Sequence, residues 1–469
     1  MLKIINLYLK RYRLIGLVKK PCISIPKICF MYFSAAAFAI FVLSGKSQAF
    51  ELNLNKTCED QESCLIHLLS IDPRIKSARK VLEASLFDVE QAKAAFLPTL
   101  NITSDLGREY IDNPSTRTAG SDYSMLFKRN IVGLANINIY SGGRDTAILD
   151  NSYNTHQMSQ LNYQAVESAV ILEGLTVFLN LIKSRHLLGL SKKGEEIVKE
   201  QLELEDYRVE QGQSLAVDVL QAKARLQMAR QRTVQLKGKV VEAYDRFVNT
   251  FGLLPPDNSA NENYAIDLPI VDFNLNGLID IGNTNNIGIQ LAKKSIQAAD
   301  QQRAISESTF YPNLNFEVRG SYERDAGATV GWRTDFSLML KASWLIFDGF
   351  STSNAVASAN KQLSARLDDN REAHRRLKID LNSMISQYVT TVETLKILEN
   401  AYNISQEMDR ARIKMEEAGK ETLINALDAK SQVIDAQIAL DGMRFDLNLI
   451  KIQIYQMIGM LSREELDLG

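Results

Sequence analysis

The chain has 469 residues, a formal net charge of -2 and four histidines. Its first 49 residues carry eight Lys or Arg residues and no acid, so their removal would leave a net charge of -10. A chain this acidic, without a basic patch interleaved with aromatic residues, is not expected to bind nucleic acid. The sequence also lacks a catalytic-triad spacing, a metal-ligand cluster and a phosphate-binding loop. We therefore expect no enzyme activity and no cofactor.

Residues 1–49 have the features of a secretory signal peptide in the usual order. The basic segment leads into an apolar run, "MYFSAAAFAIFVLSG", which is followed by Ser47-Gln48-Ala49. Small residues at the third-last and last positions predict cleavage after Ala49. The alternative is an uncleaved membrane anchor, and the shortness of the apolar core argues against it.

Two cysteines remain in the exported chain. Cys22 and Cys29 leave with the leader, whereas Cys58 and Cys64 stay, in an N-terminal periplasmic segment that we place at residues 50–72. An even pair of cysteines in an exported protein predicts a disulfide that closes a short loop.

One structural unit occurs twice in the chain. "VEQGQSLAVDVLQAKARL" at 209–226 aligns with "EEAGKETLINALDAKSQV" at 416–433, which puts Gly212 on Gly419 at an offset of 207 residues. "FLPTLNI" and "NIYSGGR" in the first half likewise correspond to "FYPNLNF" and "LIFDGFS" in the second. Such a repeat constrains the architecture, because each copy must form the same supersecondary unit.

We interpret each copy as a helix, a β-hairpin and a long helical hairpin. In the first copy these elements are predicted at 73–97, at 98–141 and at 142–252, with the helical turn near residue 212. A linker or equatorial region follows at 253–285. In the second copy the elements are predicted at 286–310, at 311–349 and at 350–460, with the turn near residue 419 and a C-terminal tail at 461–469.

Long tracts without proline predict the helices. The nine prolines lie at or before Pro114, between Pro255 and Pro269, or at Pro312, and the tracts between them are rich in helix-forming residues. From Leu215 the apolar residues step alternately by four and three, and the second copy keeps this register, which predicts left-handed coiled-coil packing. Each long helix would span about 68 residues, or roughly 100 Å. We expect the two shorter helices of each copy to stack end to end beside it.

The segments between the helices alternate apolar and polar residues. In "LNFEVRGSYE" from residue 314 and "FSLMLKASWLIF" from residue 336, one face of the expected strand is largely apolar. This alternation is typical of a membrane β-strand with its apolar side toward lipid, although an amphipathic hairpin lying on a soluble core is an alternative. The residues expected in the aromatic belt at the membrane interface are Trp332, Trp344, Phe316 and Tyr322.

Four strands per chain cannot close a barrel, and an open sheet edge cannot lie in lipid. We therefore expect a homotrimer with a twelve-stranded β-barrel, continued by a long α-helical barrel. This fold class is a mixed α and β membrane protein with an internal duplication. The export signal places it in the outer membrane of a Gram-negative bacterium, with the helical tunnel in the periplasm. The apolar stretch 165–182 carries Glu167, Glu173 and Asn180, so we interpret it as a helix packed on both sides rather than as a membrane span.

With these features the chain resembles the TolC family of outer-membrane efflux and secretion channels over nearly all of residues 65–462. The motifs are "FLPTLNI" and "FYPNLNF" before strands, "YSGGR" and "FDGF" after them, and the paired "G-x-x-x-x-x-D-V-L-Q-A" and "G-x-x-x-x-x-N-A-L-D-A". The resemblance implies a trimer whose helical turns close the pore. It also implies that these turns meet a periplasmic adaptor protein and an inner-membrane transporter of the ABC or RND type.

The resemblance places the pore constriction at the two helical turns. A family member's "D-x-x-D" reads Asn425-Ala-Leu-Asp428 here, and the first hairpin reads Asp218-Val-Leu-Gln221. Three copies of Asp428 would form an acidic ring that attracts cations. Alternatively, both aspartates are solvated residues in a first helical turn, where an acid suits the helix dipole. The candidate constriction residues are Asp428, Asp218, Asn425 and Gln221.

The turns themselves are the expected docking tip. Gly212 and Gly419 each end a long helix where the chain reverses, and glycine adopts the left-handed conformation without steric cost. The candidate adaptor contacts beside them are Arg208, Glu210, Lys414 and Lys420.

We therefore predict an outer-membrane exit duct that passively conducts substrates from an inner-membrane pump and a periplasmic adaptor. Type I protein secretion is favoured over drug efflux, because "EDYRVEQGQSLAVDVLQAKARLQMA" looks more similar to the secretion branch. The alternative is a structural coiled-coil protein of the envelope without a pore. That alternative would explain the heptads but not the duplicated amphipathic hairpins.

Overall fold

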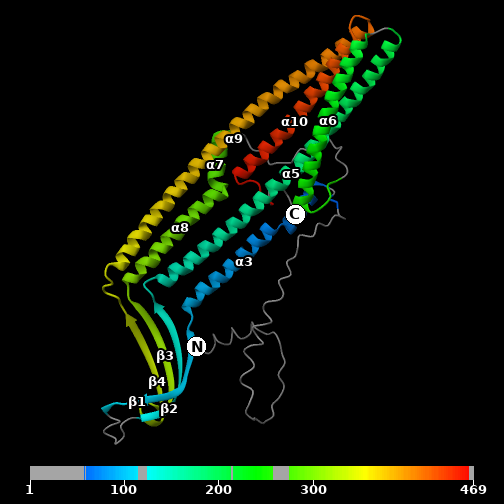
Figure 1. Ribbon diagram of the computed structural model, residues 1–469. Coiled ribbons are helices and arrows are strands. Elements are labelled where there is room, and N and C mark those ends of the chain that lie inside the picture. The colour runs from blue at the N-terminus through cyan, green and yellow to red at the C-terminus, as the bar shows by residue number, and fades with distance from the viewer. Residues whose placement is uncertain (1–56, 59, 115–123, 213–214, 257–273, 464–469) are drawn as a thin grey trace, which may run out of the picture. The chain divides into compact units, whose positions relative to one another are not determined.

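The computed structural model describes residues 57–58, 60–114, 124–212, 215–256 and 274–463 (Figure 1). All of them belong to one compact unit of the chain, Leu52–Gly469. The predicted signal peptide, residues 1–49, lies outside the described residues, as does most of the predicted tail.

Four strands form one antiparallel sheet in the order β1-β2-β3-β4 (Figure 1). Along the register Asp105 lies opposite Asn130, which lies opposite Glu323, so the polar residues of neighbouring strands share one face. The residues in between form an apolar face. The strands are β1 (Thr99–Ile111), β2 (Ser124–Tyr140), β3 (Asn313–Ala326) and β4 (Thr329–Ser343).

The strand predicted to run from Phe336 through Ile346 is shorter than expected. β4 ends at Ser343, which is the partner of Asn313, the first residue of β3. The residue before Asn313 is Pro312. Because proline has no N–H group to donate, the hydrogen bonding between β3 and β4 does not continue past Asn313. Trp344 therefore lies just beyond the strand, where its indole nitrogen donates a hydrogen bond to the Phe310 carbonyl at 3.0 Å.

Two helices of equal length run through the helical part. α5 (Arg144–Glu210) and α9 (Ser351–Glu417) have 67 residues each. α3 and α6 both pack against α5, and α8 and α10 both pack against α9, while α5 also contacts α8 and α10. The shorter helices are α3 (Pro73–Lys93), α6 (Ala216–Phe251), α8 (Ile287–Glu307) and α10 (Leu423–Met457), and short 3₁₀ turns at Ala94–Phe96 and Ser308–Phe310 lead into the sheet.

Two short helices occupy segments to which the sequence analysis assigned no secondary structure. α2 (Gln61–Ile71) lies in the N-terminal segment and α7 (Leu275–Asn285) lies in the linker. Each ends just before a capping residue: the Asp72 side chain accepts from the Arg74 N–H at 2.7 Å, and the Asn286 side chain accepts from the Ile289 N–H at 3.0 Å. Both short helices are therefore part of the repeated unit.

The hydrophobic core consists of two related clusters. The first joins α2, α5 and α6 and includes the fully buried Ile171, Phe247 and Phe251, and the second joins α7, α9 and α10 around Leu278 and Leu381. Complete burial of such a side chain contributes about 1.5–3 kcal/mol, so these clusters hold the helices of each copy together.

The apolar stretch at 165–182 belongs to the first cluster. By length and composition α5 could cross a membrane, and it is the one described helix of which this is true, but half of its most apolar window is buried inside the chain. Glu173, one of the residues that interrupt the stretch, pairs with Arg74 of α3 at 2.7 Å. Neighbouring helices of the same chain thus cover about half of the stretch.

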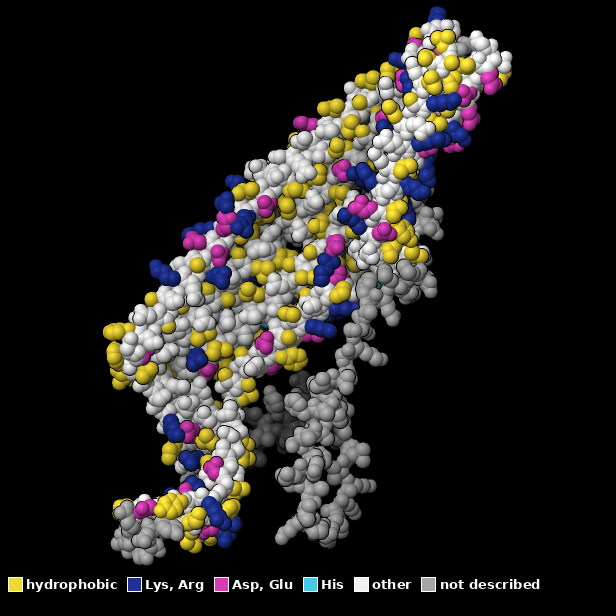
Figure 2. All heavy atoms as spheres, in the orientation of Figure 1, with side chains coloured by type: hydrophobic (Ala, Val, Ile, Leu, Met, Phe, Trp, Pro, Cys, Tyr) yellow, Lys and Arg dark blue, Asp and Glu magenta, His cyan; other side chains and the backbone are white. Residues whose placement is uncertain are grey.

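Each side of the helical layer leaves one apolar stripe uncovered. On α6, Leu220, Val234 and Val241 are exposed at multiples of seven residues, although most of the predicted seam of α6 is buried against α5. On α9, Ile397 and Ile404 are exposed with the same spacing. By contrast, α10 lies between α5 and α9, and its described residues include no exposed large apolar side chain. Figure 2 shows hydrophobic side chains on the surface of the helices and of the sheet.

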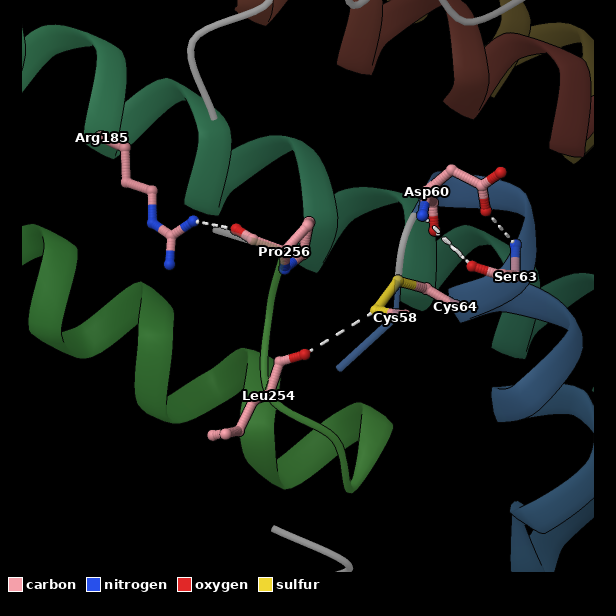
Figure 3. The surroundings of a disulfide bond; sticks show 7 residues. All are labelled: Cys58, Asp60, Ser63, Cys64, Arg185, Leu254 and Pro256. Carbon is pink, nitrogen blue, oxygen red and sulfur yellow. Dashed lines mark hydrogen bonds between the residues drawn. A yellow bond between two sulfur atoms is a disulfide. The ribbon is translucent and has the colours of Figure 1, made fainter. Parts of the chain in front are cut away.

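A disulfide joins Cys58 to Cys64, with a Cα–Cα distance of 5.4 Å (Figure 3). The Cys58 N–H donates to the Leu254 carbonyl at 3.4 Å, and both cysteines are buried in the first core cluster. Arg185 of α5 donates to the carbonyl of Pro256 at 2.8 Å nearby. The closed loop thus attaches the start of the described chain to the segment that leaves α6.

Replacement of both cysteines, Cys58→Ser with Cys64→Ser, should lower the free energy of unfolding. The loop has a sequence separation of 6, for which the loss of chain entropy in the unfolded state predicts about 2 kcal/mol. Thermal unfolding in detergent, with and without a reductant, measures it. The reductant should destabilise the wild type by the same amount and leave the double variant unchanged. A fully reduced wild type that unfolds at its original temperature would contradict this role.

Candidate functional site at the helical turns

The two helical hairpins turn in the same way. Gly212 follows α5 with φ +70° and its N–H donates to the Val209 carbonyl at 2.9 Å. Gly419 follows α9 with φ +69° and donates to the Glu416 carbonyl at 2.9 Å. A Cβ atom at either glycine would meet no atom within 4 Å, so backbone conformation alone favours glycine there.

Ion pairs join the two hairpins close to these turns. Arg208 of α5 contacts Glu416 of α9 at 2.5 Å, and Arg225 of α6 contacts Asp428 of α10 at 2.7 Å. In each of these pairs within the described part of the chain, the first repeat supplies the basic side chain and the second supplies the carboxylate. Farther from the turns the pairs are Arg232–Asp435, His186–Asp441 at 2.9 Å and Lys183–Asp446 at 2.6 Å.

This charge pattern was missed in the sequence although a signal was present. Arg225 and Arg232 are seven residues apart, as are Asp428 and Asp435, so each pair keeps the heptad register. Arginines at this spacing in α6 and aspartates at the same spacing in α10 would have indicated that the two helices face each other, although Arg225 and Asp428 are 203 residues apart and so are not at corresponding positions of the repeats. The sequence analysis considered only the acidic partner, Asp428.

The four predicted constriction residues occupy two different environments. Asp428 has a side chain that is 41% exposed, and it is paired with Arg225 rather than isolated. Both of these residues and Gln221 line a cavity of about 490 Å³ between α5, α6 and α10. The Asp218 carboxylate instead accepts the Leu215 N–H at 3.2 Å, as an acid in the first turn of α6.

Asn425 stabilises the start of α10. Its side-chain amide donates to the carboxylate of Glu421, and its backbone N–H donates to the hydroxyl of Thr422 at 3.4 Å. The hydrogen bond from the Asn425 side chain and that from the Thr422 backbone lower the pKa of Glu421. Arg412 of α9 donates to the Asn425 carbonyl at 3.2 Å, which connects both arms of the second hairpin.

The second hairpin also contains a carboxyl group whose pKa is shifted in the opposite direction, Asp409. Burial raises the pKa of Asp409 on α9, although the charges of Lys430 and Arg410 act against this shift. Burial thus favours the protonated form of Asp409, whereas the hydrogen bonds to Glu421 favour its carboxylate form.

The predicted docking residues differ in their exposure. Glu210, Lys414 and Lys420 are exposed beside the turns. Arg208 is only partly exposed, because its guanidinium is directed at Glu416. Within the described part of the chain, no group of three or more metal-ligating side chains is found.

A Gly212→Ala or Gly419→Ala substitution should destabilise the turn that contains it. A side chain at positive φ costs about 1 kcal/mol, which corresponds to roughly fivefold faster amide exchange in the last turn of α5 or α9. Hydrogen exchange followed by mass spectrometry measures this. Gly189→Ala is the matched control, because Gly189 lies inside α5 with no atom within 4 Å of its Cβ position, and it should not accelerate exchange. Unchanged exchange in both turn variants would exclude backbone strain as the reason for glycine.

Comparison with known proteins identifies the family. A family model described as outer membrane efflux protein matches residues 66–252 and 278–460. The chain belongs to this family. The predicted family, the outer-membrane localisation and the non-enzymatic nature of the protein are thereby confirmed, because members are passive channels. Such channels are trimers that work with periplasmic adaptors and inner-membrane transporters.

Individual relatives are distant in sequence but cover most of the chain. The outer membrane protein TolC of Vibrio cholerae is 20% identical over 404 residues, which are 84% of this chain and 89% of that protein. TolC of Escherichia coli K12 is 20% identical over 412 residues, or 84% and 81% of the two chains. The structure of CusC aligns with a TM-score of 0.72 at 13% identity, over 87% of this chain and 96% of that one. At this identity the structural likeness confirms the fold.

Proposed function

We propose that the chain is the outer-membrane exit duct for a type I protein secretion system and that it acts as a homotrimer. The observation that supports this proposal, and the homotrimer in particular, is that a single chain leaves both sides of its sheet and both sides of its helical layer uncovered. β1 and β4 each have one neighbouring strand, and α6 and α9 each present an exposed apolar stripe. The two edges differ from each other, so identical copies join head to tail and close into a ring.

Closure of that ring would pair the sheet edges and bury the apolar stripes of the helices at the same time. The backbone groups at the edges of β1 and β4 have no water to bind within lipid, so each edge must pair with the opposite edge of the next copy. The same rotation brings the stripe with Leu220, Val234 and Val241 toward the stripe with Ile397 and Ile404 of a neighbour. Three copies of four strands give twelve, which lies within the range of closed membrane barrels.

The proposed aromatic belt spans the height of a membrane. Trp332 lies near the end of the sheet far from the helices, and Trp344 follows β4 at the end near them. Trp344 is twelve residues after Trp332 in the sequence, a distance of roughly 40 Å along an extended strand, or about 30 Å of height at a tilt of about 40°. Phe316 and Tyr322 lie on the same apolar face, at 37% and 41% exposure.

The constriction is proposed at Asp428 with its partner. Arg225 holds the Asp428 carboxylate, so an acidic ring carries less net charge than three bare aspartates would. The conductance of the duct should therefore depend on both members of the pair.

The preference for protein cargo rests on the turn of the first hairpin. We interpret the run "EDYRVEQGQSLAVDVLQAKARLQMA" as resembling the secretion branch of the family more than the efflux branch. Drug efflux is the second candidate, and it is favoured by the name of one relative, the outer membrane efflux protein BepC of Brucella suis, which is 24% identical over 183 residues. A structural coiled-coil protein without a pore would leave the apolar sheet face and its open edges unexplained.

Substitutions of Asp428 and Arg225 should shift ion selectivity in opposite directions. In planar bilayers Asp428→Asn should lower the preference for cations and Arg225→Gln should raise it, because each removes one charge per subunit. The double variant should lie close to the wild type. Arg366→Gln with Asp369→Asn, an exposed pair on α9, is the matched control. Identical selectivity in all variants would remove Asp428 from the constriction.

Cross-linking at the turns identifies the transporter that the duct serves. A photoreactive residue at Glu210 or Lys420 should capture an adaptor and an ABC-type transporter, and loss of the chain should abolish export of a polypeptide. A photoreactive residue at Arg371 of α9, an exposed site distant from the turns, should capture neither. Capture of an RND-type transporter would assign the chain to drug efflux. Release of the chain from envelopes without detergent would overturn the channel itself.

A further inference from the structure

Three arginines lie together on the apolar face of the sheet. Arg129 of β2 is directly opposite Arg324 of β3, and it is also opposite Leu106 of β1. Arg108 lies two residues beyond Leu106 on the same face and is therefore diagonal to Arg129. Diagonal residues of paired strands are typically about 7–8 Å apart, which long side chains can bridge. All three arginines are exposed. Figure 2 shows Lys and Arg side chains among hydrophobic ones on the strands.

This arrangement is unfavourable for the protein alone. Like charges placed directly opposite each other on neighbouring strands destabilise a sheet, and Arg129 and Arg324 are such a pair. Arg324 is 3.6 Å from a carboxylate oxygen of Asp325, and Arg129 lies over the ring of Phe127 at 5.4 Å. In the described part of the chain, these contacts provide one carboxylate for three guanidinium groups.

Apart from Asp325, the acids next to the cluster in β1 and β3 lie on the other face of the sheet. Asp105 and Glu323 are the partners of Asn130, and Asp105 accepts a hydrogen bond from the Asn130 amide at 3.1 Å. Residues on the polar face alternate with those on the apolar face, so these carboxylates are separated from the arginines by the sheet. Asp105 and Glu323 therefore leave room on the apolar face for an external anion beside the arginines.

The level of the cluster indicates the kind of anion. β1 ends at Ile111, β2 begins at Ser124 and β3 ends at Ala326, so the arginines lie within a few residues of the sheet end that is far from the helices. If the chain is the outer-membrane duct proposed above, on which this inference rests, that end faces the outside. The cluster then lies at the headgroups of the outer leaflet. Trp332, the partner of Arg324, is at the same level, as expected at a membrane interface.

We propose that Arg108, Arg129 and Arg324 bind the phosphate groups of an anionic glycolipid, the diphosphorylated lipid A part of lipopolysaccharide, at the outer leaflet. Guanidinium groups match phosphate oxygens in a bidentate geometry. The apolar residues next to them, Leu106 and Ile131, lie on the side of the helices, where the acyl chains of the same lipid run. One lipid thus neutralises the arginines with its phosphates and covers the adjacent apolar residues with its acyl chains.

Lipid retention by the purified full-length channel tests this proposal. The triple variant Arg108→Gln, Arg129→Gln, Arg324→Gln should retain at least about tenfold less diphosphorylated lipid A, because it removes three positive charges that attract the anionic lipid. Native mass spectrometry in detergent with added lipid A measures the bound fraction. The corresponding triple Lys variant keeps the charge and should retain part of the binding.

Two comparisons distinguish recognition of the lipid phosphates from a general effect of positive charge. Lys128→Gln with Arg319→Gln and Arg333→Gln removes three positive charges from the polar face and should leave lipid retention unchanged. Lipid A without its phosphates should bind the wild type as weakly as diphosphorylated lipid A binds the Gln variant. Inorganic phosphate alone should not displace the bound lipid.

Equal lipid retention by the wild type and the Gln variant would overturn the proposal, as would equal binding of dephosphorylated lipid A. Full displacement by inorganic phosphate would also overturn it, because the cluster would then be a free-anion site. If the triple variant does not assemble, Arg129→Gln alone carries the same test. Bilayer conductance separates failure of the lipid A proposal from failure of the proposed channel function. A variant that conducts like the wild type shows that the duct is intact.

Discussion

The structure depends on one constraint, that backbone groups at a sheet edge cannot stay unpaired within lipid. The four strands of one chain leave β1 and β4 as edges, and no fold of four strands can remove them. The helices have a parallel requirement, because α6 and α9 carry apolar stripes that a single chain leaves exposed to water. Assembly is therefore not an addition to a finished fold. In the proposed ring, assembly pairs the backbone groups at the sheet edges and buries the apolar stripes of the helices.

The duplication explains how one chain produces a nearly regular wall. Each copy places two shorter helices beside a helix of 67 residues, and each contributes one β-hairpin. The copies nevertheless differ in chemistry, because in the described pairs between them the first repeat supplies the basic side chains and the second the carboxylates. Arg208 with Glu416 and Arg225 with Asp428 hold the two turns of one subunit together. Any movement that separates the turns must break these contacts.

Much of this architecture follows from sequence patterns that report backbone geometry. Proline positions and heptads located the long helices, and alternation located the strands, because both patterns reflect which side of an element is buried. Contacts between elements were harder to predict. The partner of Asp428 is 203 residues away, and a single acidic motif contains no information about Arg225. The early end of β4 was also missed, because it depends on where β3 begins after Pro312.

The number of chains in the detergent-extracted particle tests the central claim most directly. Native mass spectrometry should give a single species with the mass of three mature chains, because the edges of one copy are complementary to those of the next and the ring closes at twelve strands. A monomer would contradict the account, since its sheet edges would then be stable without partners. A mixture of sizes would contradict it as well, because the rotation between copies would not close.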